Sequence, residues 1–414
     1  MLSGLRGDRS GGERQHIPAP AIHEVARPQL TARITAAVRG SLTVVVAPAG
    51  WGKTIAVAQW ARTRPADVTW IDVSEHHEQG VVDIVADVIA DAADDCYVVI
   101  DRAHRLPPDT SEKLGDLIER APAAAHFVIV TRADVLFPAT IARLRIRDEV
   151  AYLHTADLSF DRDIAHRVLT SLIGETLAPA VVERVAMQTA GWPAATTIIG
   201  TAMRESTNPT DLARSFDPGD LQFRAFVRDE ILMEPDESLR DFVLKSAVAD
   251  TMSPGLCVAL TGRTDAEAVL GLLARYELFD DDPAAPTARR YRPMLRDALR
   301  AELRATDPAA ERLLLERAAA WHTDQGAVDD VEHAGEYLVR AQQWDAVCDH
   351  AERFLRLLHT QGRARVVVSW LDAVPRSAIA ADPRRVILRA AVLTLHGETL
   401  GAEATLGELG DTST

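Results

Sequence analysis

Residues 47–54 read Ala-Pro-Ala-Gly-Trp-Gly-Lys-Thr and directly follow the apolar run Thr43–Val46. An apolar β-branched run, a glycine-containing loop and a helix start, in that order, are typical of a phosphate-binding loop. Gly50 and Gly52 let backbone N–H groups approach a phosphate without a Cβ in the way. A helix that begins near Lys53 adds the positive end of its dipole. The segment therefore predicts an α/β domain that holds a nucleoside phosphate, ATP or ADP.

The side chains of this loop have separate expected roles. Lys53 is expected to reach the β- and γ-phosphate oxygens, and Thr54 to place its hydroxyl on Mg²⁺. The general pattern begins with glycine where this chain has Ala47, so a chance match in an ordinary turn stays the alternative. The rest of the predicted nucleotide-binding loop consists of Ala47, Pro48, Ala49, Gly50, Trp51 and Gly52.

Two further apolar runs end in polar residues. Tyr97–Ile100 leads into Asp101, and Val128–Val130 leads into Thr131 and Arg132. Asp101 is expected to hold Mg²⁺, directly or through water, and Thr131 or Arg132 to lie beside the γ-phosphate and sense it. The alternatives are an ordinary loop aspartate and an ordinary exposed arginine. The candidate catalytic residues are Lys53, Asp101 and Arg132, and the candidate metal ligands are Thr54 and Asp101.

The pattern of apolar runs predicts the fold class. Short β-branched runs alternate with helical stretches up to about Thr155, as in a parallel sheet covered by helices. After this point the apolar residues have helical spacing. We expect an AAA-like α/β P-loop NTPase domain followed by all-α and winged-helix domains and a short tetratricopeptide-like helical segment. The expected strands are Leu42–Val46, Val68–Val73, Cys96–Asp101, His126–Thr131 and Val150–Leu153.

Breaks in this pattern suggest domain boundaries. Pro218-Gly219 and Pro235-Asp236 separate helical stretches, and Glu277–Met294 fits the hairpin of a winged helix. One helical face is formed by residues that include Trp344, Val347 and Leu358. A second antiparallel helix pair follows, and such pairs resemble a tetratricopeptide unit of roughly 34 residues. The predicted parts are a disordered N-terminus 1–17, a nucleotide-binding domain 18–155, a helical subdomain 156–215, a winged-helix-like domain 216–305 and helical repeats 306–414.

Composition excludes several classes of protein. The 414-residue chain has a formal net charge of −16, which disfavours binding to a nucleic-acid backbone. The sequence contains no apolar run of the ~20 residues that cross a bilayer. Cys96, Cys257 and Cys348 lie far apart in apolar stretches, as small core residues do, and no zinc pattern is found. We expect a cytoplasmic protein that binds neither DNA nor membrane.

From about Ile17 to about Leu409 the sequence resembles a known family. It is similar to the signal-transduction ATPases with numerous domains (STAND), specifically the large ATP-binding LuxR-type regulators typified by the maltose-regulon activator. The matching stretches are Arg27-Pro28-x-Leu30, the loop at 47–54, Trp70-Ile71-Asp72, Val99-Ile100-Asp101-x-x-His104, Val130-Thr131-Arg132-x-Asp134, Thr189-Ala190-Gly191-Trp192-Pro193-Ala194 and His333-Ala334.

The resemblance implies a molecular switch. ADP would hold a closed monomer, whereas ATP and an inducer would favour an open state that self-associates, and hydrolysis would reset it. It further implies that Arg27 and Pro28 lie near the adenine and that Pro193 packs against the nucleotide. An inducer ligand or a protein partner would bind the C-terminal helices.

Three departures from the family affect this expectation. Arg102 stands where the family has a second acidic residue, so hydrolysis is expected to be slow or absent. Arg292 replaces a family histidine that senses the β-phosphate; a guanidinium still pairs with a phosphate but keeps its proton. The usual helix-turn-helix domain is not found in these residues. Two other readings stay open, an active AAA-like remodelling ATPase and a degenerate nucleotide-binding scaffold for protein interaction.

Overall fold

The computed structural model describes residues 16–91, 95–133, 136–232, 236–280 and 289–410. These fall into two compact units: unit 1 is assigned residues 1–226 and 271–279, and unit 2 residues 227–270 and 280–414. Several sequence predictions lie outside the described residues. They concern most of the N-terminal segment 1–17, Asp134 of the strand-end motif and the turn of the expected winged-helix hairpin.

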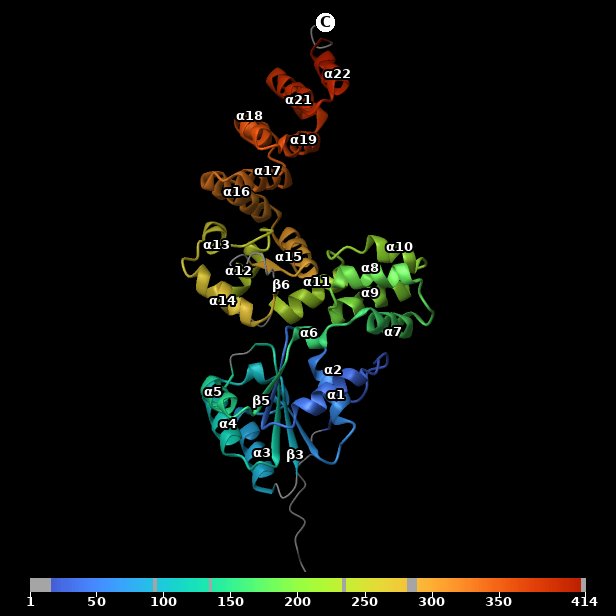
Figure 1. The fold of residues 1–414 in the computed structure, drawn as a ribbon, viewed down its shortest axis with the longest axis vertical. Helices are drawn as coiled ribbons and strands as arrows, with labels where there is room; N and C mark the ends of the chain where they lie inside the picture. The colour runs from blue at the N-terminus through green and yellow to red at the C-terminus, as the bar shows by residue number, and fades with distance from the viewer. Residues whose placement is uncertain (1–15, 92–94, 134–135, 233–235, 281–288, 411–414) are drawn as a thin grey trace, which may run out of the picture. The chain divides into compact units, whose positions relative to one another are not determined.

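Unit 1 contains a five-stranded parallel sheet in the order β2-β3-β4-β1-β5 (Figure 1). Its strands consist largely of buried β-branched residues, as in a sheet covered on both faces. The predicted strands and the predicted α/β class are confirmed, with the second strand one residue shorter and the fourth one residue longer than expected. The strands are β1 (Leu42–Val46), β2 (Val68–Asp72), β3 (Cys96–Asp101), β4 (Ala125–Thr131) and β5 (Val150–Leu153).

Helices cover both faces of the sheet. Figure 1 shows α1 and α2 on one side and α3, α4 and α5 on the other. The main core lies between the sheet and the helices α3, α4 and α5. It includes Leu114, Ile118 and Ile141 from the helices and Val98 and Phe127 from the strands. The bounds are α1 (Pro28–Ala37), α2 (Lys53–Ala61), α3 (Glu78–Asp91), α4 (Pro108–Arg120) and α5 (Pro138–Ile146).

The carboxyl ends of the strands gather at one edge of the sheet. In the parallel register Asp72 at the end of β2 lies beside Asp101 at the end of β3, and Val46 of β1 lies beside Thr131 of β4. Short 3₁₀ turns follow β2 and β3, η1 (Val73–Glu75) and η2 (Ala103–Arg105). This edge therefore collects the polar residues that end the apolar runs.

The rest of unit 1 is mainly helical. Proline at the first position starts α8, α9 and α10, where its missing N–H costs nothing. Apolar residues of α7 pack with Phe160 in a small core. The helices are α6 (Thr155–Leu158), α7 (Arg162–Ile173), α8 (Pro179–Thr189), α9 (Pro193–Glu205), α10 (Pro209–Ser215) and α11 (Leu221–Val227), the last ending at the boundary of the unit.

The second part of the chain starts with a π-helical turn, η3 (Arg228–Leu232), and short helices. Two short strands within the predicted hairpin segment pair with each other. The elements are α12 (Glu237–Ser246), α13 (Pro254–Thr261), α14 (Ala266–Arg275, whose last residues are assigned to unit 1), β6 (Phe279–Asp280), β7 (Arg290–Tyr291) and α15 (Pro293–Thr306).

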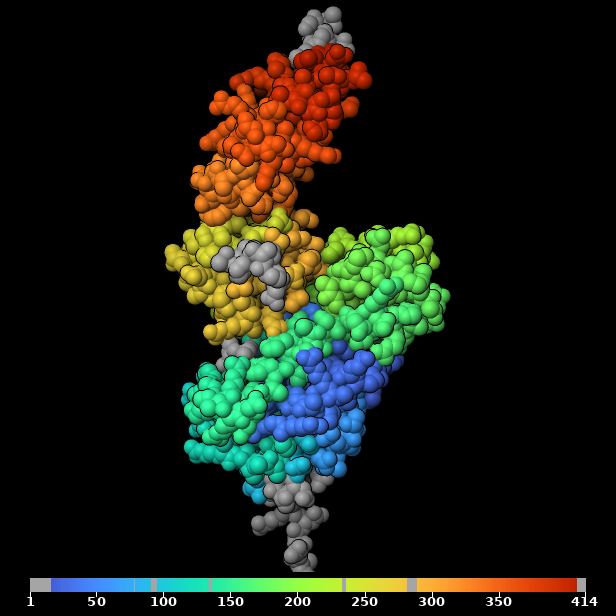
Figure 2. Space-filling model, in the orientation of Figure 1, coloured from blue at the N-terminus to red at the C-terminus, as the bar shows by residue number. Residues whose placement is uncertain are grey.

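Helices then follow one another to the end of unit 2. Neighbouring helices pack in succession, and Figure 2 shows their orange and red surface as continuous. The face predicted for α18 is confirmed, since Val347 and Leu358 are buried; the short α20 was not predicted. The helices are α16 (Pro308–Gln325), α17 (Val328–Arg340), α18 (Trp344–Thr360), α19 (Ala364–Ala373), α20 (Arg376–Ala380), α21 (Pro383–His396) and α22 (Thr399–Gly410). None of the helices in the described ranges has both the length and the apolarity that crossing a membrane requires.

Asp250 ties α15 and α17 of unit 2 together. Its carboxylate accepts hydrogen bonds from Arg300 at 2.9 Å and from Arg340 at 3.1 Å, and Arg296 lies 3.5 Å away. Burial raises the pKa of Asp250, but the guanidinium of Arg300, with those of Arg340 and Arg296, outweighs burial and holds the net pKa below its ordinary value. The carboxylate is therefore ionised in the folded chain.

We expect Asp250→Asn to lower the free energy of unfolding by about 1–2 kcal/mol at neutral pH, because three cations would face a neutral amide. A depressed folded pKa stabilises the fold above the unfolded pKa of about 3.9. This contribution is lost as the pH falls through the folded pKa. Thermal melts should therefore show the gap between wild type and variant narrowing below about pH 4.

Asp345→Asn is the matched control for Asp250→Asn. Asp345 pairs with Arg385 at 2.7 Å, but its side chain is 82% exposed. Such a pair contributes less than about 0.5 kcal/mol. Equal effects of the two substitutions would show that the Asp250 cluster does not stabilise the unit.

Candidate nucleotide-binding site

The loop Ala47–Thr54 joins β1 to α2 and is conformationally specialised. Gly50 and Gly52 have φ angles of +74° and +73°, in the left-handed region that favours glycine. A Cβ on Gly50 would lie 2.6 Å from the Cβ of Ala194 and 2.7 Å from Cζ of Phe226. Gly50 is thus required both by its backbone angle and by the close approach of the helical part of unit 1.

Lys53 begins α2 and lies under the loop. Its side chain is buried, and Nζ donates hydrogen bonds to the carbonyl oxygens of Ala47 at 2.7 Å and Pro48 at 2.8 Å. The ammonium group is therefore held at the loop, at the start of the helix where its dipole is positive. Together they form a concentrated positive field for an anion.

Thr54 and Asp101 meet, as expected for two ligands of one metal ion. The Thr54 hydroxyl donates to Asp101 Oδ1 at 3.2 Å, and the backbone N–H of Arg102 donates to the same oxygen at 2.8 Å. Asp101 is buried, and its Oδ2 atom has no hydrogen-bond partner in the described parts of the chain. Burial raises its pKa, opposed by these two hydrogen bonds. An unpartnered carboxylate oxygen beside a hydroxyl fits Mg²⁺, which prefers oxygen ligands.

Thr131 and Arg132 end β4 next to the loop. The backbone N–H of Ala47 donates to the Thr131 carbonyl at 3.4 Å. The Thr131 side chain is buried and donates to the Ala133 carbonyl at 3.0 Å, whereas Arg132 is half-buried. The sensing role predicted for these two residues stays a prediction.

Arg102 is engaged away from the Asp101 carboxylate. Its Nη1 donates to the Ser74 hydroxyl at 2.6 Å and lies 3.3 Å from Asp72 Oδ2. The backbone at Arg102 has φ +56°, an unusual angle for a residue with a side chain. A cation paired with Asp72 therefore occupies the position at which the resemblance implies a second acidic residue.

Two hydrogen bonds join the helical part of unit 1 to the loop, and the sequence did not predict them. The indole N–H of Trp192 donates to the Ala49 carbonyl at 3.2 Å, and the backbone N–H of Ala194 donates to the Gly50 carbonyl at 3.0 Å. Trp192 also stacks on Trp51 with ring centroids 6.5 Å apart. Trp192 is buried, so its hydrogen bond to the loop adds to the packing of its ring.

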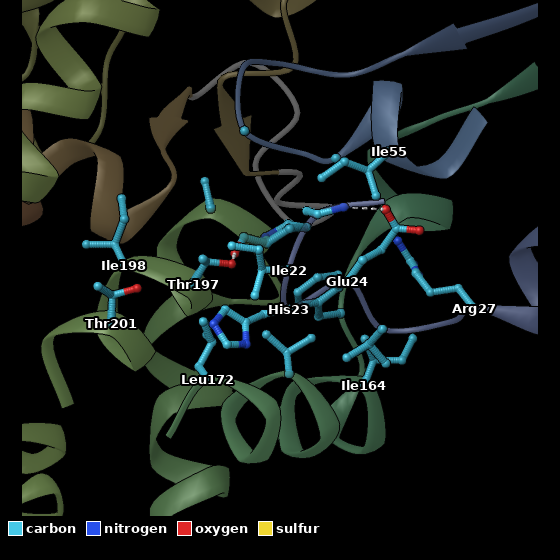
Figure 3. Close-up of a pocket in the computed structure, with 18 of the residues that line it drawn as sticks. Ile22, His23, Glu24, Arg27, Ile55, Ile164, Leu172, Thr197, Ile198 and Thr201 are labelled. Carbon is cyan, nitrogen blue, oxygen red and sulfur yellow. Dashed lines mark hydrogen bonds between the residues drawn. The ribbon is translucent and has the colours of Figure 1, made fainter. Parts of the chain in front are cut away.

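A cavity of about 580 Å³ in unit 1 adjoins the glycines of the loop. Figure 3 shows Ile55, Ile164, Thr197 and Glu24 around it. The walls are mainly apolar, and the volume lies within the range of small-molecule sites. From the sequence, the loop glycines and the motifs around Arg27 and Trp192 pointed to parts of this lining. The cavity is lined by Ala21–Val25, Arg27, Gly50, Gly52, Ile55, Ala56, Gln59, Phe160, Ile164, Val168, Leu172, Pro193, Ala194, Thr197, Ile198, Thr201, Arg204 and Phe226.

The family resemblance places three residues near the nucleotide base, and the structure gives each of them different surroundings. Pro193 lines the cavity. Arg27 also lines it, but its guanidinium donates to the carbonyl oxygens of Leu158 and Ser159, which end α6, and burial lowers its pKa. Pro28 starts α1 and lines a neighbouring hollow instead. A contact of these residues with a base stays a prediction.

Arg292 lies in unit 2, before α15. Its guanidinium is 3.6 Å from Asp280. The predicted contact of Arg292 with the β-phosphate stays a prediction.

The sheet order, the loop between β1 and α2, and the pairing of Thr54 with Asp101 define the class: the chain has a P-loop NTPase fold. Residues 228–311 match the sequence model of the MalT winged helix domain. A P-loop NTPase domain and a winged helix domain of the MalT type are thus combined in one chain.

Two curated relatives are similar in sequence. Serine/threonine-protein kinase PknK of Mycobacterium tuberculosis is 27% identical over 416 residues, covering 90% of this chain and 36% of that protein. The protein of the same name from Mycobacterium bovis gives the same values. The chain thus spans about a third of the length of the curated relatives it matches.

Solved structures also resemble the chain. A STAND protein with a tetratricopeptide repeat sensor from Pyrococcus horikoshii has a TM-score of 0.38 at 14% identity, covering 94% of this chain and 59% of that one. The Walker-type ATPase of Pyrococcus abyssi has a TM-score of 0.47 at 11% identity, covering 66% and 95%.

Proposed function

We propose that the chain is an adenine-nucleotide switch, the regulatory ATPase portion of a transcriptional regulator, which hydrolyses ATP slowly. The observation that carries this proposal is one continuous site in unit 1. A cavity large enough for a base and ribose adjoins Gly50 and Gly52, and the same loop holds the buried Lys53. A ligand with one apolar ring and one anionic end fits this arrangement.

The phosphate end would use the loop, Lys53 and Thr54. Backbone N–H groups of the loop, which Gly50 and Gly52 leave uncovered by a Cβ, and the start of α2 would bind the phosphate oxygens. Lys53 would exchange its bonds to the Ala47 and Pro48 carbonyls for phosphate oxygens. Thr54 and Asp101 would hold Mg²⁺, which would neutralise phosphate charge. Ionised Asp101 is required for this, and the ion offsets the cost of its burial.

The base end would use the apolar cavity. Phe160 and Ile164 offer flat and aliphatic contacts, and Pro193 closes the cavity next to Gly50. Desolvation of a ring against such walls supplies affinity, while the loop supplies orientation. The charged residues Glu24 and Arg27 also line the cavity, but Glu24 pairs with Arg62 and Arg27 with backbone carbonyls. The preference for adenine therefore rests on the family resemblance.

A switch requires that nucleotide binding at the site change the conformation of another part of the chain. Trp192 and Ala194 hydrogen-bond the loop carbonyls of Ala49 and Gly50, so a shift of the loop on binding is transmitted to α9. A ligand that favours one arrangement of this joint shifts the population of states. We propose that ATP favours the state that self-associates and responds to an inducer or partner on the C-terminal helices.

Slow turnover follows from Arg102. Its ion pair with Asp72 places a cation where a water-activating carboxylate would be needed. The same observation supports a second candidate function, a scaffold that retains nucleotide without a cycle. Rapid exchange of bound ADP for ATP, with self-association only in ATP, distinguishes the switch from the scaffold.

The base cavity is tested by filling it. Thr197 is exposed on α9 and lines the cavity, so we expect Thr197→Trp to weaken ADP binding on the order of 10-fold or more without unfolding the chain. Glu205→Trp on the same helix does not line the cavity and should bind normally. Isothermal titration with ADP, ATP and GTP measures this. Equal affinity of the two variants would place the base elsewhere.

A further inference from the structure

His322, Asp330 and His333 form a cluster of metal-ligating side chains in unit 2. One ligand atom from each of the three lies within 4.8 Å of the others, the only such group of histidine, cysteine and acidic residues found in the described ranges. The sequence carries no recognised metal pattern here, because the three ligands come from two helices.

The helical pair α16–α17 brings the three side chains together. α16 ends at Gln325; the next residue, Gly326, has a φ of +75° and reverses the chain, and α17 begins at Val328. Asp330 and His333 are three residues apart on α17 and therefore share one face. His322 occupies the last turn of α16 and faces them.

The state of the ligand atoms fits a metal ion. Asp330 Oδ1 lies 2.7 Å from His322 Nδ1, so these two atoms already point at one another. Nδ1 of His333 is buried without a hydrogen-bond partner anywhere in the described chain. An unpaired buried nitrogen costs free energy, and a metal–nitrogen bond would remove this cost.

The surroundings also fit a bound cation. His322 is buried and stacks on Tyr337 with centroids 5.5 Å apart, which limits its motion. The helix that carries two of the ligands is acidic, with four carboxylates at Asp329, Asp330, Glu332 and Glu336. Arg363 pairs with Asp329 and Glu332, so Asp330 and Glu336 are the carboxylates that favour a divalent cation here.

We propose that His322, Asp330 and His333 bind one divalent transition-metal ion of the zinc class. Two imidazoles and one carboxylate select Zn²⁺ and similar ions over Mg²⁺ and Ca²⁺, which prefer oxygen ligands. Bonds of about 2.0–2.1 Å in a tetrahedral site bring ligand atoms to roughly 3.3 Å of one another. Small side-chain rotations would bring the more distant ligand atoms, up to 4.8 Å apart, closer together and would move His322 Nδ1 and Asp330 Oδ1 from 2.7 Å out to this distance.

Such an ion would fasten α16 to α17. Three protein ligands leave a fourth position for water or for a donor group of a bound molecule. The stability of the α16–α17 pair would therefore depend on the concentration of the metal ion. This site lies in unit 2 and does not rest on the nucleotide site.

A plain hydrogen bond between His322 and Asp330 is the competing explanation of the cluster. It accounts for the 2.7 Å contact but leaves Nδ1 of His333 unpaired. Asp330→Asn separates the two explanations, because the amide oxygen still accepts from His322 whereas the anionic ligand is lost. His333→Gln removes the second imidazole without touching the hydrogen-bonded pair.

The test is a zinc titration of the untagged, chelator-treated full chain in millimolar Mg²⁺. Calorimetry should give one zinc per chain with sub-micromolar Kd, and the Tm should rise with zinc. Both variants should weaken zinc binding on the order of 100-fold, whereas His359→Gln, an exposed histidine of α18, should not. Cobalt(II) added to wild type should give the intense visible bands of a tetrahedral site.

Three results would overturn the proposal. They are the absence of a stoichiometric zinc site in wild type, zinc affinity unchanged in both variants, and a cobalt spectrum like that of the aqueous ion. The cobalt measurement uses wild type alone, so it decides the question even if a variant does not fold.

Discussion

Lys53→Ala should weaken the binding of ADP and ATP on the order of 100-fold while the chain keeps its fold. The Lys53 ammonium is buried at the loop and held by the carbonyl oxygens of Ala47 and Pro48. One charge-assisted hydrogen bond contributes roughly 1.5–3 kcal/mol, and tenfold in affinity corresponds to about 1.4 kcal/mol. Isothermal titration with Mg²⁺ present measures the change, and circular dichroism checks the fold.

The matched control for this experiment is Lys113→Ala. Lys113 is an exposed lysine of α4 in the same unit, so its removal changes the net charge equally without touching the loop. Denaturing the purified proteins and identifying released nucleotide adds an independent measurement. Lys53→Ala with wild-type affinity would contradict the assignment of the phosphates to this loop.

The parts of the fold that local sequence determines could be predicted. The strands are short runs of β-branched residues, and a run such as Leu42–Val46, apolar on both faces, has few alternatives to a buried parallel strand. The loop at 47–54 then fixes the position of Lys53 and Thr54. The meeting of Thr54 with Asp101 follows, because β1, which leads into the loop, and β3, which ends in Asp101, both flank β4 with their carboxyl ends at the same edge.

The walls of the cavity could not be predicted in the same way. They come from segments far apart in the chain, such as Val25, Phe160 and Thr197, and no local pattern records which of them meet. Trp192 illustrates this limit. Its apolar ring predicts burial, but the direction of its N–H toward the Ala49 carbonyl depends on how α9 packs on the loop.

The charged residues were the hardest to place from sequence. Arg27 was predicted to lie near the base, yet its guanidinium donates hydrogen bonds to the carbonyl oxygens at the end of α6. The cluster of His322, Asp330 and His333 has spacings of eight and three residues, which have meaning only when α16 and α17 pair. Side-chain partners across helices depend on tertiary packing, which a single sequence does not display.

Arg102→Asp should raise the ATP turnover of the chain on the order of 100-fold. The substitution replaces the cation paired with Asp72 by a carboxylate next to Asp101, where it can accept a proton from water. Its backbone cost is small, because aspartate and asparagine tolerate the left-handed angle found at this position. Two nearby carboxylates, Asp72 and Asp101, also raise the pKa of the new group toward neutral pH, which strengthens it as a base.

Arg102→Asn separates this chemistry from the loss of the arginine. The amide has the same size and the same backbone tolerance and likewise breaks the pair with Asp72, but it cannot take a proton. Phosphate release at saturating ATP and Mg²⁺ should therefore rise in Arg102→Asp and stay at the wild-type level in Arg102→Asn, with Lys53→Ala as the background for contaminating activity. Equal turnover in the two variants would show that the missing carboxylate does not limit hydrolysis.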